Sequence, residues 1–142
     1  MIFISYYHLH NLLDSVEKIE QVNDIINRFT TDDIVLIDKK DLMYLFDAKS
    51  IKEIKYTSNV DTDIKGRMSF IINTFNCRVD INEYTKFIML LESSSSYPLL
   101  VFEVAKLNKL YSKLPEDCRV AWGVGTDESL NKDISIDIIA SK

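Results

Sequence analysis

The first part of the chain is dominated by one long amphipathic pattern. Apolar residues recur at steps of three and four positions within Leu9–Phe29, the spacing that places them along one side of an α-helix. The polar run Thr30–Asp33 ends this pattern, and the apolar segment Ile34–Ile37 predicts a short extended stretch. Asp38 predicts the cap of a second, shorter helix over Lys39–Asp47, because its carboxylate can accept hydrogen bonds from unpaired backbone N–H groups.

The middle of the chain alternates strand and helix patterns. Ile51–Thr57 predicts a weak strand whose two faces are both mixed in polarity. The pair Asp61-Thr62 predicts the cap of a helix over Asp63–Asn76. Lys86–Glu92 is an almost unbroken apolar run, which is typical of a central strand that is covered on both faces.

The last part predicts one helix and two strands. Pro98 suits the first turn of a helix that runs to about Lys113, and Pro115 ends it. The predicted apolar stripe of this helix comprises Leu100, Val104, Leu107, Tyr111 and Leu114. Arg119–Gly125 and Asp133–Ala140 predict two strands, which by themselves would form a strand pair.

The order of these elements indicates an α/β (α+β) fold. Two helices are followed by the order β-α-β-α-β-β, which predicts a parallel crossover and a closing antiparallel strand. The expected architecture is a small mixed four-stranded sheet packed with two helices and preceded by a long helix. No Pro- or Gly-rich linker divides the chain, so we expect one domain over residues 1–142. About 9–47 would hold the long helix, a loop and the short helix, and about 48–142 the sheet.

Composition narrows the classes of function. The chain has 142 residues, of which 46% are hydrophobic, so it can form a core. Its net charge of -5 argues against nucleic acid as the main partner, since phosphate binding needs a basic face. No apolar run approaches the roughly 18 residues of a membrane span, and no signal peptide is evident. We therefore expect a cytoplasmic protein with Cys77 and Cys118 reduced.

Several segments resemble FtsZ, the bacterial relative of tubulin, among them Val79–Ile81, Phe87–Leu91 and the three that follow. Trp122-Gly-Val-Gly-Thr-Asp-Glu-Ser-Leu130 is similar to the family's Trp/Phe-Gly-x-x-x-Asp-Glu-x-Leu stretch near the end of its folded part. Leu99-Leu-Val-Phe-Glu-Val104 resembles the family's Leu-Thr-Leu-Phe-Glu-Val. Ile25–Asp38 resembles the end of the family's central helix and the loop that follows it. The resemblance covers segments from about Leu12 to Ala140, in order, and implies a C-terminal domain with the preceding central helix.

The resemblance also identifies candidate functional residues. The family's loop pattern Asn-x-Asp-x-x-Asp places its two carboxylates on Asp38 and Asp41, and its Asn on Leu36. In the family these carboxylates face the nucleotide of the next subunit and help to position the attacking water. Asp38 and Asp41 could therefore act in trans on a partner GTPase. The alternative is structural, with Asp38 as a helix cap and Asp41 as a favourable charge in the first turn.

The family's GTPase domain is absent from this sequence. Its glycine-rich phosphate loop needs adjacent glycines, whereas the chain has only Gly66, Gly123 and Gly125. We therefore expect no GTP binding by the family's mode, no cofactor or metal in this chain, and GTP with Mg²⁺ only on a partner or a missing domain. On its own the chain is not expected to be an enzyme.

Other candidate sites are weaker. His8 with His10, and Asp61 with Asp63, lack the ligand patterns of known metal sites, and Trp122 is expected in the core.

The resemblance implies a subunit-contact module of a GTP-dependent cytoskeletal filament, of the cell-division or plasmid-segregation type. The alternatives are a trans-acting GTPase-activating subunit and a small-molecule-sensing regulatory domain. The expected partner is an FtsZ/tubulin-like GTPase subunit or a second copy. A homodimer would cover apolar surface on the Leu9–Phe29 helix that one small sheet cannot.

Overall fold

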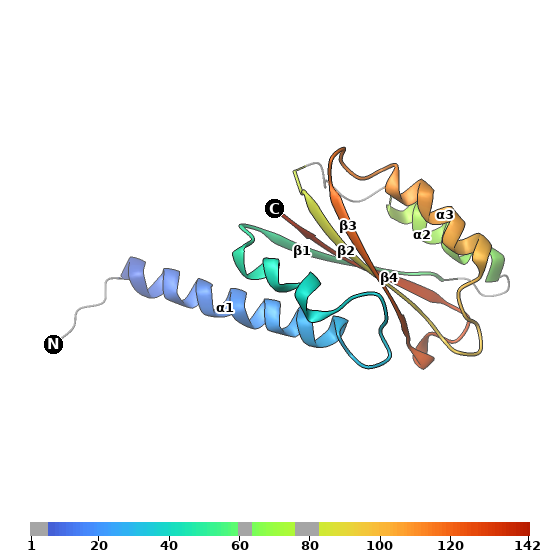
Figure 1. Ribbon diagram of the computed structural model, residues 1–142, viewed down its shortest axis with the longest axis horizontal. Helices are drawn as coiled ribbons and strands as arrows, with labels where there is room; N and C mark the ends of the chain where they lie inside the picture. The colour runs from blue at the N-terminus through green and yellow to red at the C-terminus, as the bar shows by residue number, and fades with distance from the viewer. Residues whose placement is uncertain (1–5, 60–63, 76–82) are drawn as a thin grey trace.

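The computed structural model describes residues 6–59, 64–75 and 83–142. Within them a four-stranded sheet lies between two layers of helices (Figure 1). The helices are α1 (Tyr6–Phe29), α2 (Arg67–Phe75) and α3 (Val101–Tyr111), and the strands are β1 (Ile51–Thr57), β2 (Lys86–Ser93), β3 (Arg119–Thr126) and β4 (Ile134–Ser141). Four short 3-10 turns complete the order: η1 (Lys39–Asp41), η2 (Met43–Asp47), η3 (Ile64–Gly66) and η4 (Glu128–Leu130).

The sheet has the strand order β1-β4-β2-β3. The connection through α3 makes β2 and β3 parallel, as predicted, while β4 runs antiparallel to both β1 and β2. The predicted pairing of the last two strands is wrong, because β4 crosses to the middle of the sheet instead of pairing with β3. Every residue of β4 is buried, so the last strand forms the centre of the core and β3 is left at an edge.

The two faces of the sheet carry separate apolar clusters. Phe87, Met89 and Leu91 of β2 pack in the cluster formed with α2 and α3. Ile88 and Leu90 point the other way and pack in the cluster formed with α1 and η2. The alternation follows from the two-residue period of a strand. The prediction that this apolar run is a central strand covered on both faces is confirmed.

Helix α1 covers one face with only its C-terminal half. Val22, Ile25 and Phe29 are buried, whereas the first turns of the helix project beyond the sheet (Figure 1). Val16 and Ile19 remain 43% and 49% exposed. The predicted helix is confirmed, beginning at Tyr6 rather than Leu9. In the part of the chain that the structure describes, no helix has the length and apolar character needed to cross a membrane.

Two predicted helices differ from the structure in their local form. The helix predicted over Lys39–Asp47 is two consecutive 3-10 turns. The helix predicted over Asp63–Asn76 consists of η3 and α2, and Gly66 lies at their junction. The predicted cap at Asp61-Thr62, Cys77 and the side chains of His8 and His10 lie outside the described residues.

Helix α3 begins three residues later than predicted, at Val101 instead of Pro98. Its predicted apolar stripe is also wrong at one position, because Val104 is 50% exposed and Glu103 is fully buried. The Glu103 carboxylate accepts a hydrogen bond from the Leu100 N–H at 3.0 Å. A buried carboxylate therefore orients the helix from a position that the predicted apolar stripe did not include.

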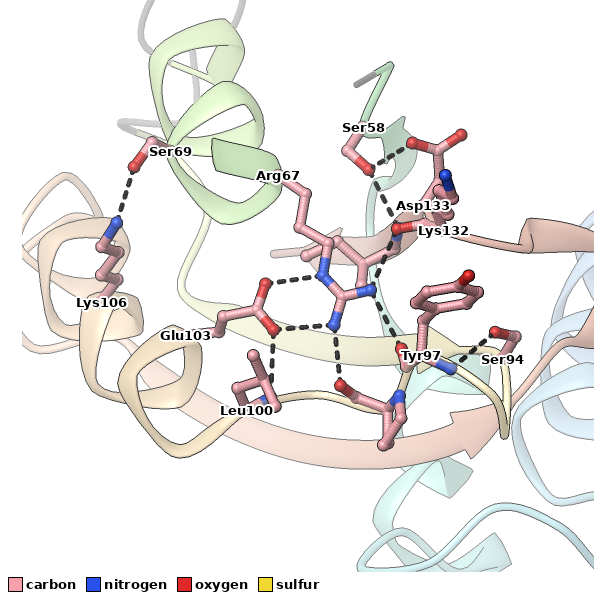
Figure 2. A network of polar contacts seen from close by, with 12 residues as sticks. Ser58, Arg67, Ser69, Ser94, Tyr97, Leu100, Glu103, Lys106, Lys132 and Asp133 are labelled. Atoms are coloured by element: carbon pink, nitrogen blue, oxygen red, sulfur yellow. Dashed lines mark hydrogen bonds and ion pairs between the residues drawn. The ribbon is translucent and has the colours of Figure 1, made fainter. Parts of the chain in front are cut away.

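The partner of Glu103 is Arg67 on α2, which is also fully buried (Figure 2). Its Nε and one terminal nitrogen donate to the two carboxylate oxygens at 2.7 and 2.8 Å. The three remaining N–H groups donate to the carbonyl oxygens of Tyr97, Pro98 and Lys132. All five donors of the guanidinium are satisfied, which offsets the cost of burying the ion pair. The ion pair connects α2 with α3, and the hydrogen bond to Lys132 connects α2 with the turn that precedes β4.

Candidate functional site

The loop between α1 and η1 lies along the open edge of β3. Val35 forms two hydrogen bonds with Val124, at 2.9 Å from its N–H and 3.0 Å to its carbonyl. The extended stretch predicted over Ile34–Ile37 is therefore reduced to a single antiparallel bridge at Val35, which fixes the position of the loop against the sheet.

Two glycines of β3 make room for the loop. A Cβ at Gly123 would lie 2.7 Å from Ile37 Cδ1, and a Cβ at Gly125 would lie 2.9 Å from Ile34 Cγ1. Both distances are shorter than a carbon–carbon contact allows. The absence of side chains at these positions therefore lets the two isoleucines approach the strand, with Ile37 buried in the α1-side core.

Asp38 and Asp41 form a reciprocal cap at the start of η1. Asp38 Oδ1 accepts hydrogen bonds from the N–H groups of Lys40 at 2.8 Å and Asp41 at 3.3 Å. Asp41 Oδ2 accepts one from the Asp38 N–H at 2.8 Å. This is a capping box, with Asp41 in the place that usually holds Glu or Gln. Both residues are exposed, so the predicted structural role is present and the pair also faces solvent.

Leu36 has an unusual conformation beside this pair. Its φ is 75°, in the left-handed region that few side chains other than those of Asn and Asp adopt readily. The side chain is 76% exposed. The resemblance aligned an Asn of the family with this position, and an Asn suits the same backbone conformation. Here the chain keeps the turn but presents an apolar side chain to solvent.

Leu36 borders an apolar groove between α3 and the edge strand β3. The groove has a volume of about 410 Å³, and its walls include Leu36, Leu91, Leu99, Val104, Tyr111 and Trp122. The rings of Tyr111 and Trp122 meet edge to face, with centroids 4.9 Å apart, and burial raises the pKa of Tyr111 to about 12. Trp122 is half-buried and packs against the core, as predicted, but its buried indole Nε1 has no hydrogen-bond partner.

Several exposed apolar side chains surround the groove. Val35, Leu36 and Val104, together with the groove, form what we call the apolar patch; each of the three is at least half exposed. A contiguous exposed surface of this kind usually marks a site of interaction. Leu36 lines the groove and Ile37 is buried in the α1-side core, so the chain crosses from the patch to the Asp38–Asp41 cap within two residues.

A charged cluster lies where the C-terminal end of α1 meets the sheet. Arg28 donates to both carboxylate oxygens of Glu53 at 2.8 Å, to Asp24 at 2.9 Å and to Asp137 Oδ2 at 3.3 Å. Burial, followed by the neighbouring Glu53, raises the pKa of Asp137 to about 7. Burial opposes ionisation of Glu53, but hydrogen bonds from Arg28 and Asp137 outweigh it and lower the pKa of Glu53.

The described residues include no group of three His, Cys, Asp or Glu side chains that could hold a metal ion. Cys118 is a half-buried free thiol.

The polar residues that sequence reasoning missed are Arg67, Glu103 and Asp137. Each lies within an apolar pattern, and only its partners in the folded chain distinguish it from a surface residue.

Comparison with solved structures identifies the architecture. An FtsZ dimer from M. jannaschii is similar over 94% of this chain, with a TM-score of 0.59 and 17% identity. The W319Y mutant of M. jannaschii FtsZ is similar over 99%, with a TM-score of 0.61 and 17% identity. The chain has an FtsZ/tubulin-like C-terminal-domain-like fold. The resemblance found in the sequence is thus confirmed at the level of the fold.

The FtsZ-like fold extends to a second group of filament proteins. A GTPγS-form protofilament of TubZ from Bacillus thuringiensis serovar israelensis is similar over 90% of this chain, with a TM-score of 0.52 and 15% identity. The chain spans 37% and 42% of the two FtsZ chains and 33% of the TubZ chain. No protein-family model and no curated protein matches the sequence.

Proposed function

We propose that this chain is a subunit-contact module of a GTP-dependent, FtsZ/TubZ-like filament in the cytoplasm. Its partner would be an FtsZ/tubulin-like GTPase subunit that holds the nucleotide, while this chain supplies the surface that the nucleotide-bearing face meets. The fold supports this role, since solved structures with the same fold include an FtsZ dimer and a TubZ protofilament. The chain itself lacks adjacent glycines for a phosphate loop.

The observation that carries the proposal is Leu36. A left-handed, non-glycine residue costs free energy in the folded chain, and an apolar side chain that is 76% exposed gains nothing from the core. Both costs are offset if the side chain is buried against a partner. Leu36 belongs to the apolar patch and lies two residues before Asp38, so we infer that the partner would cover this patch.

The test measures association with an FtsZ/tubulin-like GTPase from the same organism. We expect the chain to co-sediment with GTP-assembled polymer, and Leu36→Asp with Val104→Asp to weaken binding at least about tenfold, because both charges would be buried at the contact. Phe70→Asp is the control, since Phe70 is exposed on α2 and does not line the groove. Equal binding by both variants, or no co-sedimentation by the wild type, would contradict the proposal.

A second candidate function is activation of the partner's GTPase by Asp38 and Asp41. Exposed carboxylates can orient water or metal at a neighbour's nucleotide, because phosphoryl transfer depends on positioning and electrostatics. Each of the two carboxylates uses one oxygen in the capping box. The resemblance supports the role through position alone, and Leu36 supplies no polar group in place of the family's Asn.

The aspartate pair has its own test. Asp38→Asn with Asp41→Asn should preserve the cap, since Asn caps helices about as well as Asp, and should preserve binding to polymer. If the carboxylates act in trans, the rate of GTP hydrolysis by the partner falls by a factor of about 10² or more on this substitution. An unchanged hydrolysis rate with intact binding would leave the pair as a structural cap and the contact role untouched.

A further inference from the structure

A second cavity lies on the α1 side of the sheet, where β2 and β3 begin. It has a volume of about 330 Å³, and its polar lining comes from η1, η2 and the two strands. The charged and aromatic lining residues are Lys40, Asp41, Tyr44, Lys86 and Arg119. Three cations thus border one cavity in a chain whose net charge is -5.

Two of the cations are direct neighbours in the sheet. Lys86 and Arg119 are paired in the parallel register of β2 and β3, so their side chains leave the sheet on the same face. Like charges opposite each other on adjacent strands destabilise a sheet. The Lys86 Nζ lies 4.4 Å from the centroid of the Tyr44 ring, which holds the ammonium at the cavity wall.

Neighbouring carboxylates do not balance this charge. Among the ion pairs of the described residues, none includes Lys40, Lys86 or Arg119. Of the carboxylates in the described residues, only Asp41 lines the cavity, and one of its oxygens already accepts the Asp38 N–H. Three cations therefore border this cavity, and the Tyr44 ring contacts one of them.

We propose that this cavity, which we call the basic pocket, binds a small phosphate-bearing anion with a diphosphate group. A planar guanidinium presents paired N–H donors that match phosphate oxygens, and ammonium groups add compact charge. Three cations against one carboxylate suit an anion of multiple charge in a small volume. The basic pocket needs no GTPase subunit, so this inference stands apart from the proposed function.

The experiment uses the purified full chain and sodium pyrophosphate, with sodium chloride at matched ionic strength as the reference. Pyrophosphate should raise the Tm by about 3 °C or more at saturation, because a ligand that binds only the folded state stabilises it. Lys86→Gln with Arg119→Gln should abolish that rise. The same double substitution should not lower the Tm without ligand, since it removes the repulsion.

The matched control is Lys49→Gln with Lys52→Gln, which removes the same charge from exposed positions outside the basic pocket. This control should keep the full rise in Tm. No rise in the wild type beyond the chloride reference would overturn the proposal. An equal rise in the Lys86→Gln/Arg119→Gln variant would also overturn it, because the anion would then bind elsewhere.

A second measurement locates the binding site on the wild type, without any variant. Backbone amide chemical shifts should change on pyrophosphate addition around Lys40–Tyr44 and Arg119–Ala121, and changes confined to other segments would overturn the assignment. GDP, titrated in parallel, separates the two sources of a diphosphate. A stronger response to GDP supports a nucleoside-borne group, and a stronger response to pyrophosphate supports a free one.

Discussion

The sequence predicts the structural role of some single residues and not of others. Asp38 was predicted as a cap from its place before a short helical pattern, because capping depends on neighbours within three positions. Arg67 and Glu103 were not predicted as a buried pair. They lie 36 positions apart, and a hydrophobicity pattern cannot reveal which carboxylate will find an internal guanidinium. It therefore assigned the inner position to Val104, which is exposed.

Asp137 leads to a prediction at the same scale, about pH. Its carboxyl group ionises near pH 3.8 in a free chain, but burial beside Glu53 raises its pKa to about 7 in the folded protein. Between these values the folded state binds more protons than the unfolded state. The stability from this proton is therefore full below about pH 4 and is lost as the pH rises towards 7.

We expect the free energy of unfolding to fall by on the order of 2 kcal/mol between about pH 5.5 and pH 8 from this group alone. Asp137→Asn should remove that part of the dependence, because the amide keeps a similar shape without the charge. Urea denaturation of both proteins across the pH range measures the difference. Parallel pH profiles for the two proteins would show that Asp137 ionises normally in the folded state.

At the scale of elements, local patterns predicted the bounds of the strands well but not which strands pair in the sheet. The bounds of β1 were predicted correctly, and those of β2, β3 and β4 to within one residue at either end. The order β1-β4-β2-β3 was missed for β4 because strand pairing is decided by distant segments. Ser135 and Asp137 gave β4 an alternating pattern, which is usual for a strand with one solvated face. Here both faces are covered, and Asp137 is accommodated by Arg28.

The contact between the loop and β3 gives a prediction for these elements. Gly123→Ala would place a Cβ 2.7 Å from Ile37 Cδ1 and 3.0 Å from Cγ1, so the Ile37 side chain must rotate or the loop must shift. We expect a loss of about 1–3 kcal/mol in the free energy of unfolding. Faster hydrogen exchange is expected at the Val35 and Val124 amides, which form the bridge.

Ile37→Val provides the control because it removes the Cδ1 atom from the close approach. The double variant Gly123→Ala/Ile37→Val should be less destabilised than the sum of the two single variants. Additive effects would mean that Ile37 does not limit the space at Gly123, and that another cause must account for the glycine.

At the scale of the whole molecule, the fold class was predicted correctly from the order of elements, and the resemblance from short motifs that occur in order along the chain. The order of elements does not indicate how much of the long helix the sheet covers. A helix of 24 residues is about 36 Å long at 1.5 Å per residue, and a sheet with strands of seven and eight residues cannot cover it. The N-terminal half of α1 therefore projects from the body (Figure 1).

This projecting helix predicts self-association. Val16 and Ile19 are exposed and continue an apolar stripe that the sequence extends to Leu12 and Leu9. Burial of such a stripe stabilises an interface by roughly 25 cal/mol per Å² of apolar area before the costs of association are counted. We expect the wild type to form dimers at micromolar to millimolar concentration, measured by sedimentation velocity and light scattering.

Val16→Glu with Ile19→Glu should shift the chain to monomer, because two carboxylates would have to be buried at the contact. Gln21→Glu with Asn27→Glu is the matched control, since it adds the same charge at exposed polar positions of α1 and should leave the dimer intact. A wild type that stays monomeric and binds no dye specific for apolar surface would contradict the prediction. Loss of dimer in both variants would point to net charge, rather than the stripe, as the determinant of association.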